Sequence, residues 1–143
     1  MATSDNVLRA GLTPKHRDVD NLLASLTWTF GAAHAVTPAP TPLAETAAYS
    51  SVYAAPVPEF AVVRVALPPG AREVHRACAG PSILVVTRGA GTLGAAGGDD
   101  GAAALELGLE LEEGAVVFIG AGVGVAFASG SADRLELYRA YYP

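Results

Sequence analysis

The sequence predicts an all-β domain, either an antiparallel sandwich or a barrel, on three observations. After Pro58 the chain contains seven short apolar runs, rich in Val, whose side chains alternate with a period of two or are apolar throughout. Turn-forming Gly, Pro, Asp or Ser separates each run from the next. No helical periodicity lies between the runs, and the length of 143 residues suits a single core.

The N-terminal segment predicts a short helix before the strands begin. In "DVDNLLASLTW", Asp18 or Asp20 is placed to cap a helix that carries Leu22, Leu23 and Leu26 on one face. The pattern lasts for about two turns at 3.6 residues per turn. We therefore expect a small amphipathic helix with one apolar face.

Residues 31–58 have a different composition, dominated by Ala, Pro, Thr and Ser. Prolines stand at positions 38, 40, 42, 56 and 58. Because proline lacks an N–H donor and fixes φ, this density opposes regular hydrogen-bonded structure and favours an extended chain. The segment is predicted to be a connector, either a linker or a strap lying over the core.

The seven runs predict the strands of the domain, and the "GGDDG" stretch at 97–101 predicts a hairpin turn. Asp-Gly and Gly-Gly pairs tolerate the positive φ angles that tight turns require. The predicted strands are residues 60–67, 82–88, 91–96, 103–111, 115–119, 123–128 and 134–142.

Charge and cysteine content exclude several classes of function. The formal net charge is -5 and no Lys/Arg cluster is present, so the electrostatic basis for binding nucleic acid is absent. No run of eighteen apolar residues and no secretory signal pattern appears, and we expect a soluble, cytoplasmic protein without a membrane partner. The single cysteine, Cys78, lacks a base-and-orienter pattern and is predicted to be a buried or loop thiol rather than a nucleophile.

Two segments of the sequence indicate which kind of all-β fold to expect. "SILVVTRGAGTL" and "LEEGAVVFIGAGVGVAF" both consist of a strand, a glycine-containing turn and a second strand. In this order and separation they resemble the two conserved motifs of the cupin family. The resemblance implies a double-stranded jelly roll, preceded here by the short helical segment and the Pro/Ala-rich connector.

The cupin resemblance also implies where a metal would bind. Metal-binding cupins use two histidines and a glutamate from the first motif and a histidine from the second, positions that fall on His75, Ala77, Ser82 and Val125. One imidazole cannot hold a transition metal that takes three or four ligands, so no metal is expected on this chain. His75 is expected to be exposed, or hydrogen-bonded at a strand end. The interior is expected to be packed with apolar side chains and to lack convergent polar groups. This disfavours the hypothesis that the protein is a cupin that binds a small molecule.

The first residues carry a more specific resemblance. "MATSDNVLRAGLTPK" is similar to the end of a signature of class I mannose-6-phosphate isomerases, and "GPSILVVTRGAGTL" and "LELYRAYY" resemble that family's C-terminal cupin. These zinc-dependent cytoplasmic enzymes interconvert mannose 6-phosphate and fructose 6-phosphate and so supply GDP-mannose. In the family the zinc ligands and the glutamate proposed as the base precede the position of Met1. The resemblance implies residues 1–30 as a remnant of the catalytic domain, 31–58 as the connector and 59–143 as the cupin.

The family match assigns roles to two cations. Arg9, in "RAG", would stabilise oxyanion or phosphate charge as a catalytic residue, and Lys15, in "TPK", would bind the substrate phosphate. Gly11 would allow a tight turn between them, and Pro14 would stiffen the approach to Lys15. Without the match, Arg9 and Lys15 would be read as solvated surface charges.

Two functions follow as expectations. The first is a C-terminal fragment of the isomerase, inactive alone, whose full-length form takes a phosphosugar and zinc and whose missing catalytic half contacts this chain. The second is a stand-alone non-metal cupin that acts as a binding or assembly module. An ordered segment 1–30 packed on the jelly roll favours the module, whereas exposed leucines in that segment favour the fragment.

Overall fold

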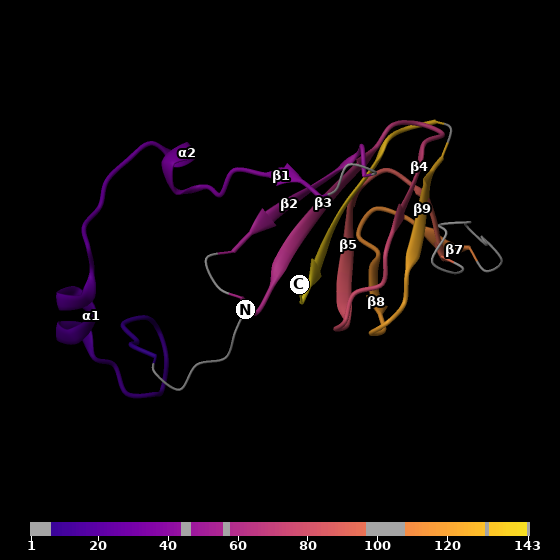
Figure 1. The fold of residues 1–143 in the computed structure, drawn as a ribbon. Coiled ribbons are helices and arrows are strands. Elements are labelled where there is room, and N and C mark those ends of the chain that lie inside the picture. Colours follow the sequence, from indigo (N-terminus) through magenta and orange to yellow (C-terminus); the bar gives the residue numbers. More distant parts are fainter. Residues whose placement is uncertain (1–6, 44–46, 56–57, 97–107, 131, 143) are drawn as a thin grey trace. The chain divides into compact units, whose positions relative to one another are not determined.

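The structure is a computed structural model that describes residues 7–43, 47–55, 58–96, 108–130 and 132–142. The chain divides into two compact units, residues 1–37 and residues 38–143, and each is described by itself (Figure 1). The hairpin turn predicted at 97–101 and the first part of the strand predicted at 103–111 lie outside the described residues.

Residues 7–37 contain two short helices, α1 (Val19–Ser25) and α2 (Ala33–Val36). Asp18 caps α1, because its Oδ1 accepts a hydrogen bond from the Asn21 N–H at 3.2 Å. This confirms the predicted short helix, with Asp18 rather than Asp20 as its cap, although the helix ends at Ser25 and Leu26 lies at its C-cap. No residue of α1 is buried, and Leu23 remains 48% exposed. No helix in the described ranges has the length and apolar character needed to cross a membrane.

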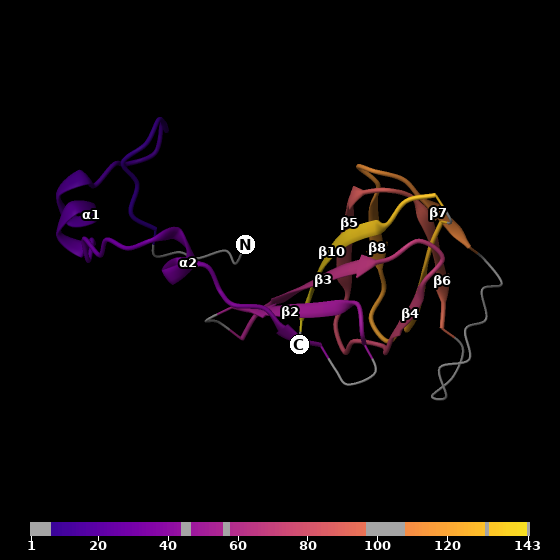
Figure 2. The same ribbon diagram turned by 90° about the horizontal axis from the view of Figure 1, so that it is seen from above.

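The second unit consists of two antiparallel sheets (Figure 2). The six-stranded sheet has the order β1-β2-β3-β10-β5-β8 and the four-stranded sheet the order β4-β9-β6-β7. This arrangement is the predicted all-β jelly roll. The strands are β1 Thr41–Pro42, β2 Ser50–Ala54, β3 Ala61–Leu67, β4 Arg72–His75, β5 Ser82–Arg88, β6 Gly91–Ala95, β7 Leu109–Leu111, β8 Val116–Ile119, β9 Val125–Ser129 and β10 Leu135–Tyr141.

The sequence-based description of residues 31–58 is wrong for part of the segment. Residues 50–54 form β2, which pairs along its whole length with β3, and residues 41–42 form the edge strand β1. Residues 50–54 contain no proline, so every N–H there remains able to donate to a ladder. The prolines of the segment lie outside β2, and Pro42 lies on the edge strand, where a missing donor is tolerated. The domain boundaries at residues 30 and 58 stay predictions.

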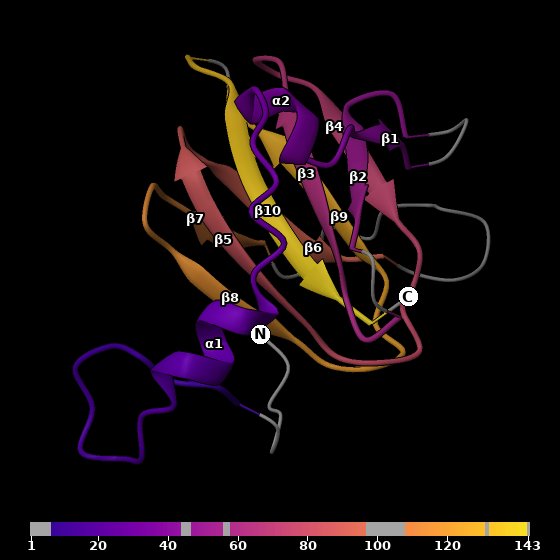
Figure 3. The same ribbon diagram turned by 90° about the vertical axis from the view of Figure 1, so that its left-hand side faces the viewer.

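The core lies between the two sheets and follows the period-two pattern of the strands. In β3 and β10 alternate side chains are buried, and β10 lies in the middle of its sheet between β3 and β5 (Figure 3). Each of these strands therefore covers the core with one face only. The buried apolar cluster consists of Val63, Val65, Leu67, Leu84, Val86, Leu93, Leu111, Ile119, Val125, Phe127, Leu135 and Leu137.

Both glycine-containing turns of the cupin-like motifs are present. Gly89 lies between β5 and β6 with a φ of 78°, and Gly122 lies between β8 and β9 with a φ of 73°. Positive φ values of this size favour glycine, because other residues bring Cβ against the backbone there. The two motifs thus fold as the sequence predicts.

Candidate functional site

The interior of the jelly roll contains polar side chains, which corrects the expectation that convergent polar groups are absent. Glu73 and His75 project inward from β4, and Arg139 projects inward from β10 in phase with the buried Leu135 and Leu137. The buried polar residues among those described are Ser50, Glu73, His75, Ser82, Ser129 and Arg139. The alternation in "LELYRAYY" carries this signal, since its arginine shares the phase of the leucines.

Glu73 is the acceptor at the centre of the first polar group. Its Oε2 accepts the backbone N–H of Tyr49 at 2.7 Å. Its Oε1 accepts the hydroxyl of Ser50, and the Nε2 of His75 lies 2.9 Å from the same oxygen. Because β4 and β2 belong to different sheets, this Glu73 cluster (Tyr49, Ser50, Glu73 and His75) joins the two layers.

The surroundings of Glu73 decide its charge. Burial by itself would raise the pKa of this carboxyl, since Glu73 is 5% exposed. Hydrogen bonds from His75, Ser50 and the Tyr49 N–H favour the carboxylate and outweigh that effect, so the pKa of Glu73 is lowered from its ordinary value. His75 also packs edge-on against Phe127, with ring centroids 5.0 Å apart. The hydrogen-bonded alternative predicted for His75 is confirmed, and the exposed alternative is wrong.

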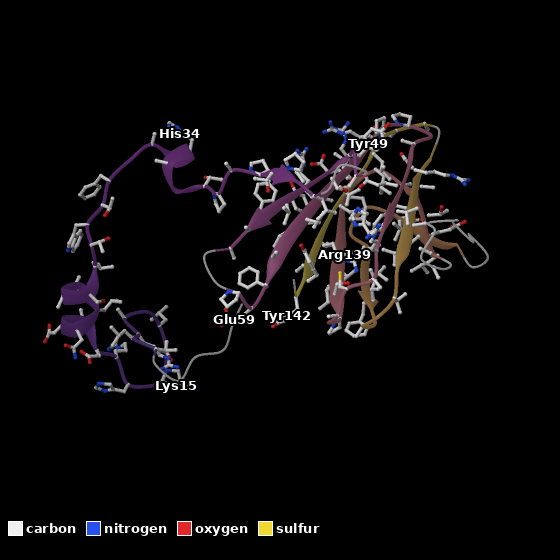
Figure 4. The ribbon with its side chains drawn as sticks, in the orientation of Figure 1. Lys15, His34, Tyr49, Glu59, Arg139 and Tyr142 are labelled. Atoms are coloured by element: carbon white, nitrogen blue, oxygen red, sulfur yellow. The ribbon has the colours of Figure 1, made fainter. Side chains whose placement is uncertain are left out.

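Arg139 forms the second polar group and is 2% exposed. Its Nε donates to the Ser82 Oγ at 2.9 Å, and its Nη2 donates to the Cys78 Sγ at 3.4 Å. Burial lowers the pKa of Arg139, because desolvation penalises the charged form. In Figure 4 the labelled Arg139 lies among the strands of the second unit. Within the described part of the chain, no carboxylate lies within salt-bridge distance of it.

A cavity of about 490 Å³ brings residues of both polar groups to one place. Its polar lining includes His75, Cys78 and Arg139, and a second arginine, Arg76, lies on its wall. Apolar side chains make up much of the remainder, as in most sites that take a small molecule. The lining residues are Leu43, Ala47, Val63, Val74, His75, Arg76, Ala77, Cys78, Arg139 and Tyr141.

The residues around this cavity do not fit a metal ion. Of the positions that correspond to cupin ligands, Ser82 accepts the bond from Arg139, and the aliphatic Val125 pairs with His75 across the β4–β9 ladder. No group of three or more His, Cys, Asp or Glu side chains suited to a metal occurs within the described ranges. Transition metals in proteins take three or four such ligands, so we derive no reaction step through a metal here.

Arg9 and Lys15 lie in the other unit, on a loop that leads into α1. A hydrogen bond of 2.9 Å from the Asp18 N–H to the Arg9 carbonyl closes the loop, and the Lys15 N–H donates to the Thr13 hydroxyl at 3.2 Å. Arg9 is half-buried, and Lys15 is exposed. The expected tight turn at Gly11 is not one that requires glycine, because its φ is not positive and an added Cβ would meet nothing within 4 Å. The roles of Arg9 and Lys15 stay predictions.

Two facing antiparallel sheets and two glycine turns in the cupin-like motifs define the second unit as a cupin-type jelly roll. Solved structures agree with this class. A cupin-like protein from Thermotoga maritima matches with a TM-score of 0.50 and 25% identity, over 64% of this chain and 66% of its own. A Bacillus halodurans protein matches with a TM-score of 0.51 and 20% identity, over 60% and 64%, and supports the fold alone.

Sequence comparison finds similar proteins among the mannose-6-phosphate isomerases. Residues 50–98 match the family described as phosphomannose isomerase type I C-terminal. The mannose-6-phosphate isomerase of Cryptococcus neoformans is 40% identical over 141 residues, which is 99% of this chain and 30% of that protein. Mannose-6-phosphate isomerase 2 of Arabidopsis thaliana is 37% identical over 98% of the chain and 28% of its own length. Over nearly its full length the chain is similar to mannose-6-phosphate isomerases, and it spans about a third of these relatives' length.

Proposed function

We propose that this chain is the C-terminal region of a mannose-6-phosphate isomerase and that it has no isomerase activity alone. The observation that carries the proposal is similarity to the Cryptococcus enzyme over 99% of the chain, which includes both the loop of Arg9 and the jelly roll. That similarity covers only 30% of the Cryptococcus enzyme. Zinc and the residues that hold it belong, in this proposal, to the remainder of such an enzyme.

In that enzyme Arg9 and Lys15 act on the phosphosugar as fixed positive charges. Isomerisation moves a proton between C1 and C2, which places negative charge on the neighbouring oxygens. The guanidinium of Arg9 presents several N–H donors in one plane and suits an oxyanion or a phosphate, whereas the Lys15 ammonium is a compact charge for the phosphate end. The substrate, the zinc requirement and the cytoplasmic location all come from the family resemblance.

A chimeric enzyme tests this proposal. The aligned third of the Cryptococcus enzyme is replaced by this chain, and turnover of mannose 6-phosphate is measured with added zinc. We expect turnover by the chimera and none above background by the chain alone. Replacing Arg9 with alanine is expected to lower kcat/KM on the order of 10²–10³-fold, as when a donor to developing charge is removed, and Lys15→Ala to act mainly on KM.

Arg17 supplies the matched control, since it is an exposed arginine in the same loop with no assigned role. Arg17→Ala is expected to leave kcat/KM within a factor of about two, because exposed substitutions away from a site have small effects. Turnover by the chain alone, or an Arg9→Ala chimera as active as the Arg17→Ala chimera, contradicts the proposal.

The outer face of the six-stranded sheet supports a contact with the rest of such an enzyme. Four outward apolar side chains adjoin there, because Ile83 pairs with Phe118 and Val85 pairs with Val116 across the β5–β8 ladder. Phe118 is 68% exposed and Val116 67%. Contiguous exposed apolar surface of this kind marks interaction sites. We assign this β5–β8 face as the surface that the remaining part of the isomerase covers.

Replacing Phe118 with serine tests that assignment in the chimera. We expect a lower midpoint of thermal inactivation in the chimera and little change in the unfolding free energy of the isolated chain, because Phe118 points away from the core. Val123→Ser, at an exposed apolar position outside the β5–β8 face, is the control and is expected to change neither value. Equal effects of Phe118→Ser on chimera and chain would refute the contact.

A further inference from the structure

We propose that the cavity of the second unit binds a small organic oxyanion of the phosphate-ester type through Arg139. This site goes beyond the isomerase proposal, because its residues are those of the jelly roll and not the loop of Arg9 and Lys15. It also differs from a cupin metal site, since its central group is a cation.

The first step is the state of Arg139 inside the protein. A guanidinium carries five N–H donors and stays protonated under ordinary conditions. The bonds to Ser82 and Cys78 use two of them, so three remain. Both partners are neutral groups or weak acceptors, and no described carboxylate pairs with the charge. A buried cation without a counter-ion is costly, and an anion in the adjoining cavity would supply the missing charge and acceptors.

The second step is the charge around the cavity. Arg76 also lines it, so two arginines border the same space. Glu73 is the acidic member of the neighbouring Glu73 cluster. Both of its oxygens already accept bonds, from Tyr49, Ser50 and His75. Glu73 is therefore engaged within its own cluster and forms no ion pair with Arg139.

The third step is the size and lining of the space. A volume of about 490 Å³ falls within the range of small-molecule sites, well above that of a bare inorganic ion. Apolar walls from Leu43, Val63 and Val74 suit a carbon body, and Tyr141 lines the same space. Two arginines match the charge of a phosphate ester, close to -2 near neutral pH, better than that of a single carboxylate.

Cys78 makes the binding measurable. It lines the same cavity, contacts Arg139 and is the only cysteine of the sequence, so the rate of its reaction with a chromogenic disulfide reports access to the site. Probes are inorganic phosphate, mannose 6-phosphate, mannose and citrate, each compared with sodium chloride at equal ionic strength. At about ten times its Kd, a bound probe is expected to slow the reaction by about ten-fold, because only the free fraction reacts.

Three variants separate specific binding from screening. Arg139→Met is expected to abolish protection by inorganic phosphate and mannose 6-phosphate, and Arg76→Ala to weaken it. Arg72→Ala removes an exposed arginine of β4 that does not line the cavity, and it is expected to leave protection unchanged. If Arg139→Met does not fold, Arg139→Lys keeps the charge without the planar fork and is expected to weaken protection.

Four results overturn the proposal. The first is that neither inorganic phosphate nor mannose 6-phosphate slows the reaction of Cys78, and the second is that sodium chloride slows it equally. The third is equal protection of Cys78 in the Arg139 and Arg72 variants. The fourth is that citrate or mannose protects Cys78 more strongly than mannose 6-phosphate does. None of them bears on the isomerase proposal, whose chimera assay depends on Arg9.

Discussion

Replacing Glu73 with alanine is expected to destabilise the jelly roll by about 3–5 kcal/mol, the cost of breaking a buried hydrogen-bonded pair. The substitution leaves His75, Ser50 and the Tyr49 N–H without their common acceptor in a site where water is scarce. It also removes the link between the two sheets. Urea unfolding followed by tyrosine fluorescence measures the loss.

Glu136→Ala is the control, since it removes a glutamate whose side chain is 12% exposed and which pairs with Arg64 at 2.8 Å and with Arg134 at 3.3 Å. The side chains of these arginines are 35% and 47% exposed, and pairs with solvent-exposed partners contribute about 0–1 kcal/mol each. We expect a loss far smaller than that of Glu73→Ala. Equal losses in the two variants would mean that the Glu73 cluster adds nothing beyond an ordinary surface pair.

The same carboxylate predicts how stability depends on pH. Because the pKa of Glu73 is lower in the folded protein than its ordinary value of 4.5, the folded state binds the proton less tightly than the unfolded state. Its stabilising contribution is therefore full above pH 4.5 and is lost as the pH falls through the lower folded-state pKa. Glu73→Ala is expected to flatten this acid decline, whereas parallel curves for the two proteins would exclude Glu73 as its source.

Replacing Gly89 with alanine is the second change with a large expected effect. At a φ of 78° an L-residue costs about 1–2 kcal/mol. In addition, the new Cβ would lie 1.9 Å from the carbonyl oxygen of Arg134, a backbone atom next to β10 that cannot rotate away. Forced overpacking adds about 1–3 kcal/mol, so a total loss of about 2–5 kcal/mol is expected in chemical denaturation.

Gly114→Ala separates the two causes. Gly114 has a similar φ of 87°, but a Cβ there would meet nothing within 4 Å. Only the backbone cost of about 1–2 kcal/mol is expected. A Gly89→Ala variant no less stable than Gly114→Ala would show that the β5–β6 turn relaxes away from Arg134.

Particular elements explain which parts of the fold were predictable. β3, β5 and β10 follow from local alternation, since one buried and one exposed face leave a visible period of two. β4 was missed because its sequence, "REVH", has only one aliphatic residue, and the residues it buries are polar. β2 was missed because the composition of a long segment outweighed five residues that contain no proline.

The candidate site residues also include some that the sequence predicts and some that it does not. Arg9 and Lys15 were found from a contiguous motif, and the structure adds the hydrogen bond that closes their loop. Arg139 was not singled out, although its phase among the leucines of β10 indicates burial. What faces Arg139 could not be predicted, because Ser82 and Cys78 lie more than fifty residues away along the chain.

The all-β class, the glycine turns and the resemblance to the isomerase family can be predicted from the sequence alone. So can the absence of a full cupin ligand set at the positions of His75, Ala77, Ser82 and Val125. These properties depend on local alternation, on backbone freedom at glycine and on contiguous motifs, all of which can be read along the chain. That Glu73 and Arg139 are buried, and which groups they contact, follows from the three-dimensional structure alone. Burial and pairing of charges depend on strand register and on which strands of the two sheets face each other, and neither is recorded in any one stretch of the sequence.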